Sequence, residues 1–465
     1  MRIGAALFDN NNIRGRDQTL IALDGAWASI SGGNPRRIES IHDLPNDIIW
    51  YTSLMFADYN QSRLARHPNF RGSDWLRTAM PLLLAEFGLD EPNATRGMAA
   101  KYMALLSARV LKVSNKRFGL VPANPFALAE DFSVAFDLPR PRLPEEMQAA
   151  FHSLAEHYYV QVVSDVSTST RQSVMRLTRN RLVHAREMLS VPLPPDIGWQ
   201  NIKIQKDNSD AWLDTLTTPF IARVRIKNIN PAVADIMSFG SGGKQIKEWM
   251  TDIEWRVYRE HCTIDIVSVF ACKNDELVIH PMAGYLPTGI LSELSPTFGI
   301  IAENMWLSLC KGFRSGSSAP PKYTAAAAYL RAIDRITLFK IALQLATRGI
   351  SINSYSTGSI SVFCPENDIG RIVNIASQYG LLPPRSKIFE HERKMQSRPE
   401  HQRIPITSPP KELGLVVLDH HLRTNVNTAQ YFDIDERIIN DALTDEERHQ
   451  YLAEQLKQNT TPMEA

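Results

Sequence analysis

The sequence has few cysteines, no excess of either charge and no long apolar run. Its four cysteines contain no pair two residues apart and no histidine at zinc-site spacing, which argues against a zinc ribbon and is typical of a reducing compartment. No run of about 18 uncharged apolar residues occurs, so no transmembrane helix is expected. The start, MRIGAALFDNNNIRGRD, lacks the charged and apolar regions of a signal peptide. We therefore expect a cytoplasmic protein without a membrane partner, from a bacterium or from an element living in one.

Motifs of several common protein classes are also missing. No G-x-S-x-G elbow is present, so nothing favours a hydrolase. Residues 242–244 read GGK but are followed by Gln245, and the phosphate-loop pattern is not met. The adjacent His420 and His421 would point to opposite faces of a strand, which argues against a shared metal ion.

The composition is that of an ordinary globular protein. The chain has 465 residues, of which 44% are hydrophobic and 22% are charged. That length allows two or three domains with their own cores. The net charge is only +1. Any nucleic-acid surface must therefore come from local clusters of basic residues.

The apolar spacing predicts a mixed α/β chain. Alternating or continuous apolar runs predict strands at residues 20–27, 47–56, 220–229 and 261–272. Helical spacing predicts helices at residues 75–87, 97–113, 171–189 and 323–349. The proline-rich residues 137–146 cannot continue a helix and predict a linker. From residue 433 the tail reads as an acidic amphipathic helix, which favours a protein partner.

A hairpin is predicted directly after the long helix. That helix ends at Gly349, and residues 350–355 and 359–364 are strand-like runs joined by Ser-Thr-Gly. The segment from Ser354 to Ile360 resembles the palm hairpin of protein-primed family B DNA polymerases, which carries Y-x-D-T-D-S-[ILV]. In this sequence the two aspartates of that motif become Ser356 and Gly358.

The resemblance implies a metal site that has lost its ligands. In the family, phosphoryl transfer uses two Mg²⁺ ions held by carboxylates. A serine hydroxyl is a weaker ligand and a glycine has no side chain. Upstream, the sequence around Asp165 is similar to the family motif D-x-x-S-L-Y-P-S, which makes Asp165 the place of a surviving carboxylate. An ordinary capping or turn role for Asp165 stays open.

Other family motifs have only loose counterparts. The fingers motif is echoed in residues 304–313, where Lys311 is a candidate. In the N-terminal third, the resemblance puts Asp24 at the first exonuclease carboxylate, but the next expected acid is Ala26. Asp58 stands at the second exonuclease motif. Since two metal ions need several carboxylates, we expect the exonuclease site to be inactive.

Basic clusters supply candidate nucleic-acid contacts, because guanidinium groups match phosphate oxygens. Each cluster has an equally open interpretation as a solvated surface. Along the strand predicted at 220–229, three cations alternate and should share one face, which costs energy unless an anion pairs with them. The candidates are Arg171, Arg176, Arg179, Arg223, Arg225, Lys227, Lys311, Lys387, Arg393 and Lys394.

The apolar spacing predicts an α/β (α+β) protein, and the resemblance implies an RNase H-like exonuclease domain followed by a right-hand polymerase palm, fingers and small thumb. The segments would be 1–140 for the degenerate exonuclease-like domain, 141–380 for palm and fingers, and 381–465 for the thumb-like region and acidic helix. We expect a DNA- or RNA-binding protein, catalytically inactive, in replication of a mobile element or phage. No cofactor is expected.

Two alternatives stay open. An active polymerase would need Mg²⁺ at an atypical site, built from carboxylates such as Glu366, Asp368 or Asp265. The other alternative is a protein-interaction scaffold that binds no nucleic acid.

Overall fold

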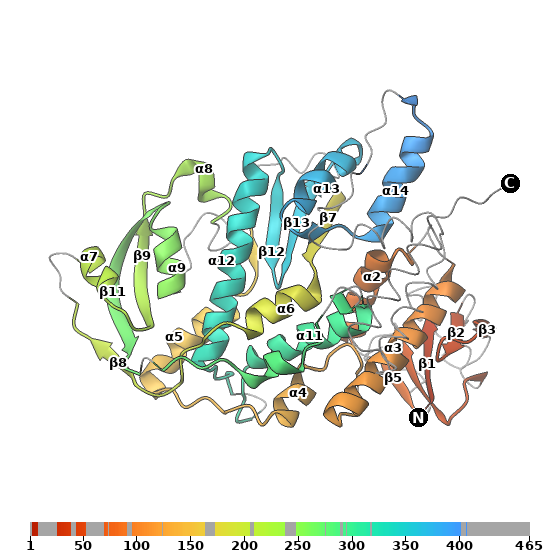
Figure 1. Cartoon of the computed structure of the whole chain (residues 1–465), viewed down its shortest axis with the longest axis horizontal. Helices are drawn as coiled ribbons and strands as arrows, with labels where there is room; N and C mark the ends of the chain where they lie inside the picture. The colour runs from red at the N-terminus through yellow and green to blue at the C-terminus, as the bar shows by residue number, and fades with distance from the viewer. Residues whose placement is uncertain are drawn as a thin grey trace, which may run out of the picture. The chain divides into compact units, whose positions relative to one another are not determined.

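The structure is a computed structural model of the whole chain, shown in Figure 1. It describes residues 2–7, 26–38, 43–52, 69–72, 74–90, 95–122, 124–162, 173–204, 209–237, 248–274, 276–288, 292–293, 295–316, 319–400 and 406. The chain divides into two compact units, each of which is described by itself. Unit 1 comprises residues 1–131, 287–301 and 383–465, and unit 2 comprises residues 132–286 and 302–382. The three-part division predicted from the sequence stays a prediction.

Unit 1 contains a mixed five-stranded sheet in the order β3-β2-β1-β4-β5. Strands β1, β2 and β3 are antiparallel neighbours, whereas β4 and β5 run parallel to β1. The strands are β1 (Arg2–Leu7), β2 (Ala26–Ile30), β3 (Arg36–Ile38), β4 (Ile48–Thr52) and β5 (Phe70–Gly72). Gly4 lies in β1 where a Cβ would meet the ring of the buried Trp50, so the glycine lets β4 place a large aromatic against the strand.

The first strand of this sheet was not predicted from the sequence. The strand predicted at residues 20–27 is described only from Ala26, which begins β2, the second strand of the sheet. Both Asp24 and Asp58 lie outside the described residues. The predicted strand at 47–56 is confirmed from Ile48 to Thr52.

Helices accompany the sheet of unit 1, and α3 packs on β1 and β2. The helices predicted at 75–87 and 97–113 are confirmed, the second one longer than predicted. Helix α3 begins after the cap Thr95 and ends at Gly119, whose φ of 68° suits a glycine. The helices are α2 (Asp74–Phe87), α3 (Arg96–Phe118) and α14 (Arg385–Gln396), and the division between the units falls within α4 (Ala129–Ala135) and α11 (Pro296–Leu309).

Unit 2 contains two antiparallel sheets. The first has the order β10-β9-β11-β8 and the second has the order β14-β7-β13-β12-β6. The strands are β6 (Val160–Gln161), β7 (Ser173–Arg179), β8 (Trp199–Ile202), β9 (Phe220–Lys227), β10 (Trp249–Thr251), β11 (Thr263–Cys272), β12 (Ile352–Ser356), β13 (Ser359–Cys364) and β14 (Leu381–Leu382). The strands predicted at 220–229 and 261–272 are confirmed as β9 and β11.

Long and short helices complete unit 2. Helix α12 lies beside β12 and β13, as Figure 1 shows. The helices are α5 (Glu145–Glu156), α6 (Arg181–Leu189), α7 (Ser209–Asp214), α8 (Pro231–Ala234), α9 (Asp252–Tyr258), α12 (Ala325–Thr347) and α13 (Ile369–Ser377), with the 3-10 turns η5 (Pro281–Tyr285) and η6 (Glu366–Asp368).

The helix predicted at 171–189 is wrong in its first half. Among the described residues of this range, 173–179 form strand β7 and Arg181–Leu189 form helix α6. Met175 and Leu177 alternate with exposed or half-exposed residues, which is a strand period that the arginine-rich composition obscured. Asn180 then caps α6, since its side chain accepts hydrogen bonds from the N–H groups of Leu182 and Val183, both at 3.1 Å.

The long predicted helix at 323–349 is confirmed as α12. Its N-cap Thr324 accepts a hydrogen bond from the Ala327 N–H at 3.1 Å, and Gly349 follows its last turn with a φ of 74°. The guanidinium of Arg335 is fully buried in an ion pair with Glu254 of α9, which ties α12 to the first sheet of unit 2. Helix α12 is therefore the common support of both sheets in this unit.

No helix among the described residues is long and apolar enough to cross a membrane. All four cysteines are described, and none of them forms a disulfide. Burial raises the pKa of the Cys310 thiol to about 11, so this thiol stays protonated at neutral pH.

Candidate functional site

The predicted hairpin is confirmed, and its turn has the geometry of a tight two-residue loop. Ser356 of β12 pairs with Ser359 of β13, and Thr357 and Gly358 make the turn between them. Both turn residues have positive φ, 46° at Thr357 and 67° at Gly358, which matches the right-handed twist of the flanking strands. The Ser359 hydroxyl donates to the Ser356 carbonyl at 2.8 Å and closes the loop.

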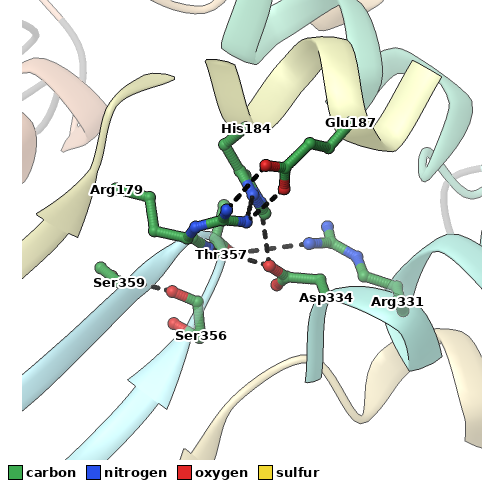
Figure 2. A network of polar contacts seen from close by, with 9 residues as sticks. Arg179, His184, Glu187, Arg331, Asp334, Ser356, Thr357 and Ser359 are labelled. Carbon is green, nitrogen blue, oxygen red and sulfur yellow. Dashed lines mark hydrogen bonds and ion pairs between the residues drawn. The ribbon is translucent and has the colours of Figure 1, made fainter. Parts of the chain in front are cut away.

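A buried acid and a buried histidine hold this turn. Asp334 of α12 accepts a hydrogen bond from the Gly358 N–H at 3.0 Å through Oδ1. His184 of α6 places Nε2 at 3.0 Å from the same oxygen. The side chains of His184 and Asp334 are only 4% and 2% exposed, and Figure 2 shows both pointing at the tip of the hairpin. Residues from α6, α12 and the hairpin therefore meet at one oxygen atom.

The network continues from His184 to the end of β7. Arg179 Nη1 lies 2.8 Å from His184 Nδ1, and the same guanidinium donates to Glu187 at 2.6 and 2.9 Å. A guanidinium has donors only, so Nδ1 must accept and the ring proton is assigned to Nε2, the nitrogen that lies 3.0 Å from Asp334 Oδ1. Figure 2 shows the resulting chain from Glu187 through Arg179 and His184 to Asp334.

Asp334 is ionised in this setting. Burial by itself would raise the pKa of its carboxyl. The His184 ring, the charge of Arg331 and the Gly358 N–H outweigh burial, so the pKa lies below its ordinary value. The ionised Asp334 carboxylate therefore stabilises the hairpin turn through its contacts with the Gly358 N–H and His184.

The space beside Gly358 is filled by the His184 ring. A Cβ built on Gly358 would lie 2.8 Å from His184 Cδ2 and 3.1 Å from its Nε2. An aspartate at this position would need both the strained positive φ and the volume of a buried imidazole. The residues present at the turn therefore do not fit the carboxylate-held Mg²⁺ pair that the sequence resemblance implies for this place. Within the described residues, no three His, Cys, Asp or Glu side chains gather where they could hold a metal ion.

One face of the hairpin sheet carries hydroxyl groups and an arginine. Residues paired directly across antiparallel strands share a face. The register pairs Ser354 with Ser361, Ser361 with Arg176, and Ser359 with Thr178. Arg176 Nε donates to the Ser359 hydroxyl at 3.1 Å. The described residues of this face in β7, β12 and β13 include no acid: Val174, Arg176, Thr178, Ser354, Ser356, Ser359, Ser361 and Phe363.

The opposite face of the same sheet is apolar. Tyr355, Ile360 and Leu177 share it, and each of them is at most 2% exposed. Helix α12 packs against β12 and β13. The sheet thus separates an apolar core from a face that carries hydroxyl groups and Arg176 and, among its described residues, no acid.

The structure also locates the cationic strand predicted at 220–229. Arg223, Arg225 and Lys227 do share the exposed face of β9, as the alternation predicted. Arg223 forms an ion pair with Glu248, and Lys227 forms one with Asp265 of β11. Carboxylates of the protein itself therefore pair with two of these cations. Their role in nucleic-acid binding stays a prediction.

The other predicted basic residues lie on separate elements. Lys387 and Lys394 of α14, in unit 1, both donate to Glu390 at 2.8 Å, and Arg393 lies on the same helix. Their hydrogen bonds outweigh burial and lower the pKa of the Glu390 carboxyl. Lys311 is half-exposed and follows α11.

Two predicted residues of the palm region, Asp165 and Arg171, lie outside the described residues. Of the three carboxylates considered for an atypical metal site, Asp265 pairs with Lys227 and Asp368 lies 3.2 Å from Arg371. The third, Glu366, opens η6.

Sequence reasoning missed most of the residues that hold the turn. None of His184, Asp334, Glu187 and Arg331 is among the candidate residues predicted from the sequence. Asp334 and Arg331 sit three residues apart on a helix that is otherwise rich in alanine and leucine. Two charged residues on one face of an apolar helix could have indicated a buried polar site.

Comparison with known proteins adds a distant structural likeness. No protein-family model and no curated protein matches the chain. Among solved structures, the chain is similar to phi29 DNA polymerase complexed with primer-template DNA, with a TM-score of 0.44 and 14% identity, covering 78% of this chain and 80% of that chain. It is also similar to phi29 DNA polymerase complexed with single-stranded DNA, with a TM-score of 0.44, 13% identity and the same coverage.

Proposed function

We propose that this chain is a nucleic-acid-binding protein of polymerase-like architecture whose hairpin does not hold catalytic metal ions. The observation that carries the second half of this proposal is the His184 ring beside Gly358. If a catalytic site had only lost its carboxylate, the space for that carboxylate would still be free. Here the position is occupied by a side chain that is itself bound to Asp334 and Arg179.

The predicted domain identities belong to the same proposal. In unit 1, the order β3-β2-β1-β4-β5, with the first three strands antiparallel and the last two parallel to β1, supports an RNase H-like, exonuclease-derived domain. In unit 2, the antiparallel sheet with the hairpin at its centre supports a palm. The role we propose is structural or regulatory, in replication of a mobile element or phage.

The polar face of the hairpin sheet supports the nucleic-acid-binding half. Serine and threonine hydroxyls and a guanidinium all donate hydrogen bonds to phosphate oxygens. An acid on that face would repel a phosphate backbone, and the described residues of the face include none. Arg176 lies at the centre of the face and supplies its positive charge.

A primer-extension assay tests the inactive hairpin. The wild type, in Mg²⁺ and separately in Mn²⁺, should incorporate no nucleotides on a primed template. The double variant Ser356→Asp/Gly358→Asp, which restores the letters of the motif, should be equally inactive because the second aspartate displaces His184. Template-dependent incorporation by the wild type, abolished by Asp165→Asn, would instead establish an active polymerase.

A titration with labelled DNA and RNA at two salt concentrations tests the binding. We expect binding at low salt that weakens as salt rises, since phosphate contacts release counterions. Arg176→Gln should weaken the binding several-fold more than Lys340→Gln, a matched change on the exposed side of α12. Absence of any binding at low salt would remove the proposal and leave the protein-interaction scaffold.

A further inference from the structure

We infer that Arg331 binds a nucleotide phosphate at the tip of the β12–β13 hairpin, so that a fixed guanidinium serves where a polymerase would use metal ions. The phosphate can belong to a nucleic-acid strand or to a free nucleotide, and the two share the same chemistry. The strand version rests on the function proposed above. Neither the sequence motifs nor the structural likeness assigns a role to this residue.

Two aromatic rings hold the Arg331 side chain. Its Cζ lies 4.9 Å from the centroid of the Tyr158 ring and 5.5 Å from that of Trp306. Trp306 is 1% exposed, so one side of the guanidinium rests on the core, whereas Tyr158 is 45% exposed. Contacts with ring faces stabilise a cation without using its hydrogen-bond donors. The position of the guanidinium is therefore set before any ligand arrives.

The donors of Arg331 have few partners among the residues that the structure describes. The Nη1 group lies 3.5 Å from the Thr357 hydroxyl, at the outer limit of a hydrogen bond, as drawn in Figure 2. The Nε atom is buried and has no hydrogen-bond partner in the part of the chain that the structure describes. A buried donor without a partner costs free energy, so the described protein groups around Arg331 do not satisfy its guanidinium.

Arg331 also differs from the other arginines near it. Arg335, one turn further along α12, pairs with Glu254, Arg179 pairs with Glu187, and Arg181 pairs with Glu303 at 3.0 Å. No carboxylate among the described residues lies within ion-pair distance of Arg331. The charge of Arg331 lowers the pKa of Asp334, but Oδ1 of Asp334 already contacts His184 Nε2 and accepts from the Gly358 N–H. A half-buried guanidinium without a carboxylate partner among the described residues is a candidate to bind an external anion.

The surroundings favour a phosphate carried by a nucleotide. A guanidinium offers a planar fork of donors that matches two phosphate oxygens. The exposed Tyr158 ring beside it can stack on a base or contact a sugar. Arg176 contacts Ser359, two residues along the same hairpin from Thr357, so two guanidinium groups reach side chains of one turn.

The test compares binding of two probes to the full chain and to single variants. One probe is a fluorescein-labelled single-stranded oligonucleotide, and the other is a fluorescent nucleoside triphosphate, both at low salt without divalent metal. Arg331→Gln removes the charge, Arg331→Lys keeps it without the fork, and Tyr158→Leu removes the exposed ring. Lys340→Gln is the control, because it removes the same charge from the exposed side of the same helix.

We expect Arg331→Gln to weaken binding of at least one probe by about tenfold relative to Lys340→Gln, and Arg331→Lys to restore only part of it. For the strand, the dependence of log affinity on log salt should fall by about 0.7, as for one lost phosphate contact. Weakening of the oligonucleotide identifies a strand, and weakening of the triphosphate alone identifies a free nucleotide. Circular dichroism verifies that each variant is folded.

Three outcomes separate the two proposals. If the wild type binds the oligonucleotide and Arg331→Gln behaves like Lys340→Gln with both probes, the Arg331 site is refuted and the nucleic-acid-binding function stands. If the wild type binds only the triphosphate, and through Arg331, the proposed function fails and the site stands. If Arg331→Gln does not fold, Tyr158→Leu decides, and unchanged affinity for both probes in that variant overturns the site.

Discussion

Replacing Gly358 by alanine measures how firmly the hairpin turn is closed. Two costs add at this position. An L-residue in the left-handed region costs roughly 1–2 kcal/mol, and Gly358 has a φ of 67°. The new Cβ would also lie 2.8 Å from Cδ2 of the buried His184 ring, and overpacking of this kind costs about 1–3 kcal/mol. We therefore expect Gly358→Ala to lower the free energy of unfolding by about 2–5 kcal/mol.

Gly349→Ala is the matched control for the backbone cost. Gly349 follows the last turn of α12 with a φ of 74°, and a Cβ there would meet nothing within 4 Å. The alanine at 349 should therefore cost only about 1–2 kcal/mol. Urea unfolding followed by circular dichroism gives both values, and an unchanged dependence of stability on denaturant keeps the comparison valid.

The difference between the two glycine variants isolates the contact with His184. If Gly358→Ala costs no more than Gly349→Ala, the ring can move aside without loss. The account of an occupied carboxylate position would then be refuted. A further variant, Gly358→Ala with His184→Ala, should recover part of the clash cost, although the deletion leaves Asp334 without its histidine contact.

Three further predictions concern the network and its supporting helix. Asp334→Asn should lower the free energy of unfolding by about 1–3 kcal/mol at neutral pH. The pKa of Asp334 lies below its ordinary value of 3.8, so the difference from wild type should be complete above pH 3.8 and shrink as the pH falls through the lowered pKa. Urea unfolding across pH 3–7 measures this difference. A difference that instead grows on acidification contradicts the assignment. Glu254→Gln and Arg335→Met should each lower the free energy of unfolding by about 3–5 kcal/mol, whereas the double variant should lower it by far less than their sum. Strict additivity would show that the buried pair is not coupled. Thr324→Ala should cost about 1 kcal/mol by loss of the α12 cap and Thr324→Ser almost nothing, which thermal melts can separate.

Much of the local structure followed from the sequence. The hairpin was predicted from two strand-like runs around Thr357 and Gly358, and the helix before it from its apolar spacing and terminal glycine. These features depend on turn chemistry and periodicity, which act within a few residues. Strand β7 was predicted as a helix because its arginines hid a short two-residue period, which its pairing with β13 brings out in the structure.

Only part of the candidate site could be predicted from the sequence. Ser356 and Gly358 could be identified because the motif that they interrupt is local in sequence. The group that fills the space at Gly358 is His184, 174 positions earlier in the chain. A contact over that separation depends on how α6 and α12 pack against the hairpin, and no periodicity or composition encodes it.

The sequence by itself determined that the hairpin lacks two carboxylates, because an absent side chain is absent in every conformation. Only the tertiary structure decided what took their place. It brought the charge of Asp334, the His184 ring and the Arg331 guanidinium to one turn from two helices. Burial makes these contacts matter, because a charge or a hydrogen-bond donor removed from water costs free energy unless it has a partner in the protein or binds a ligand.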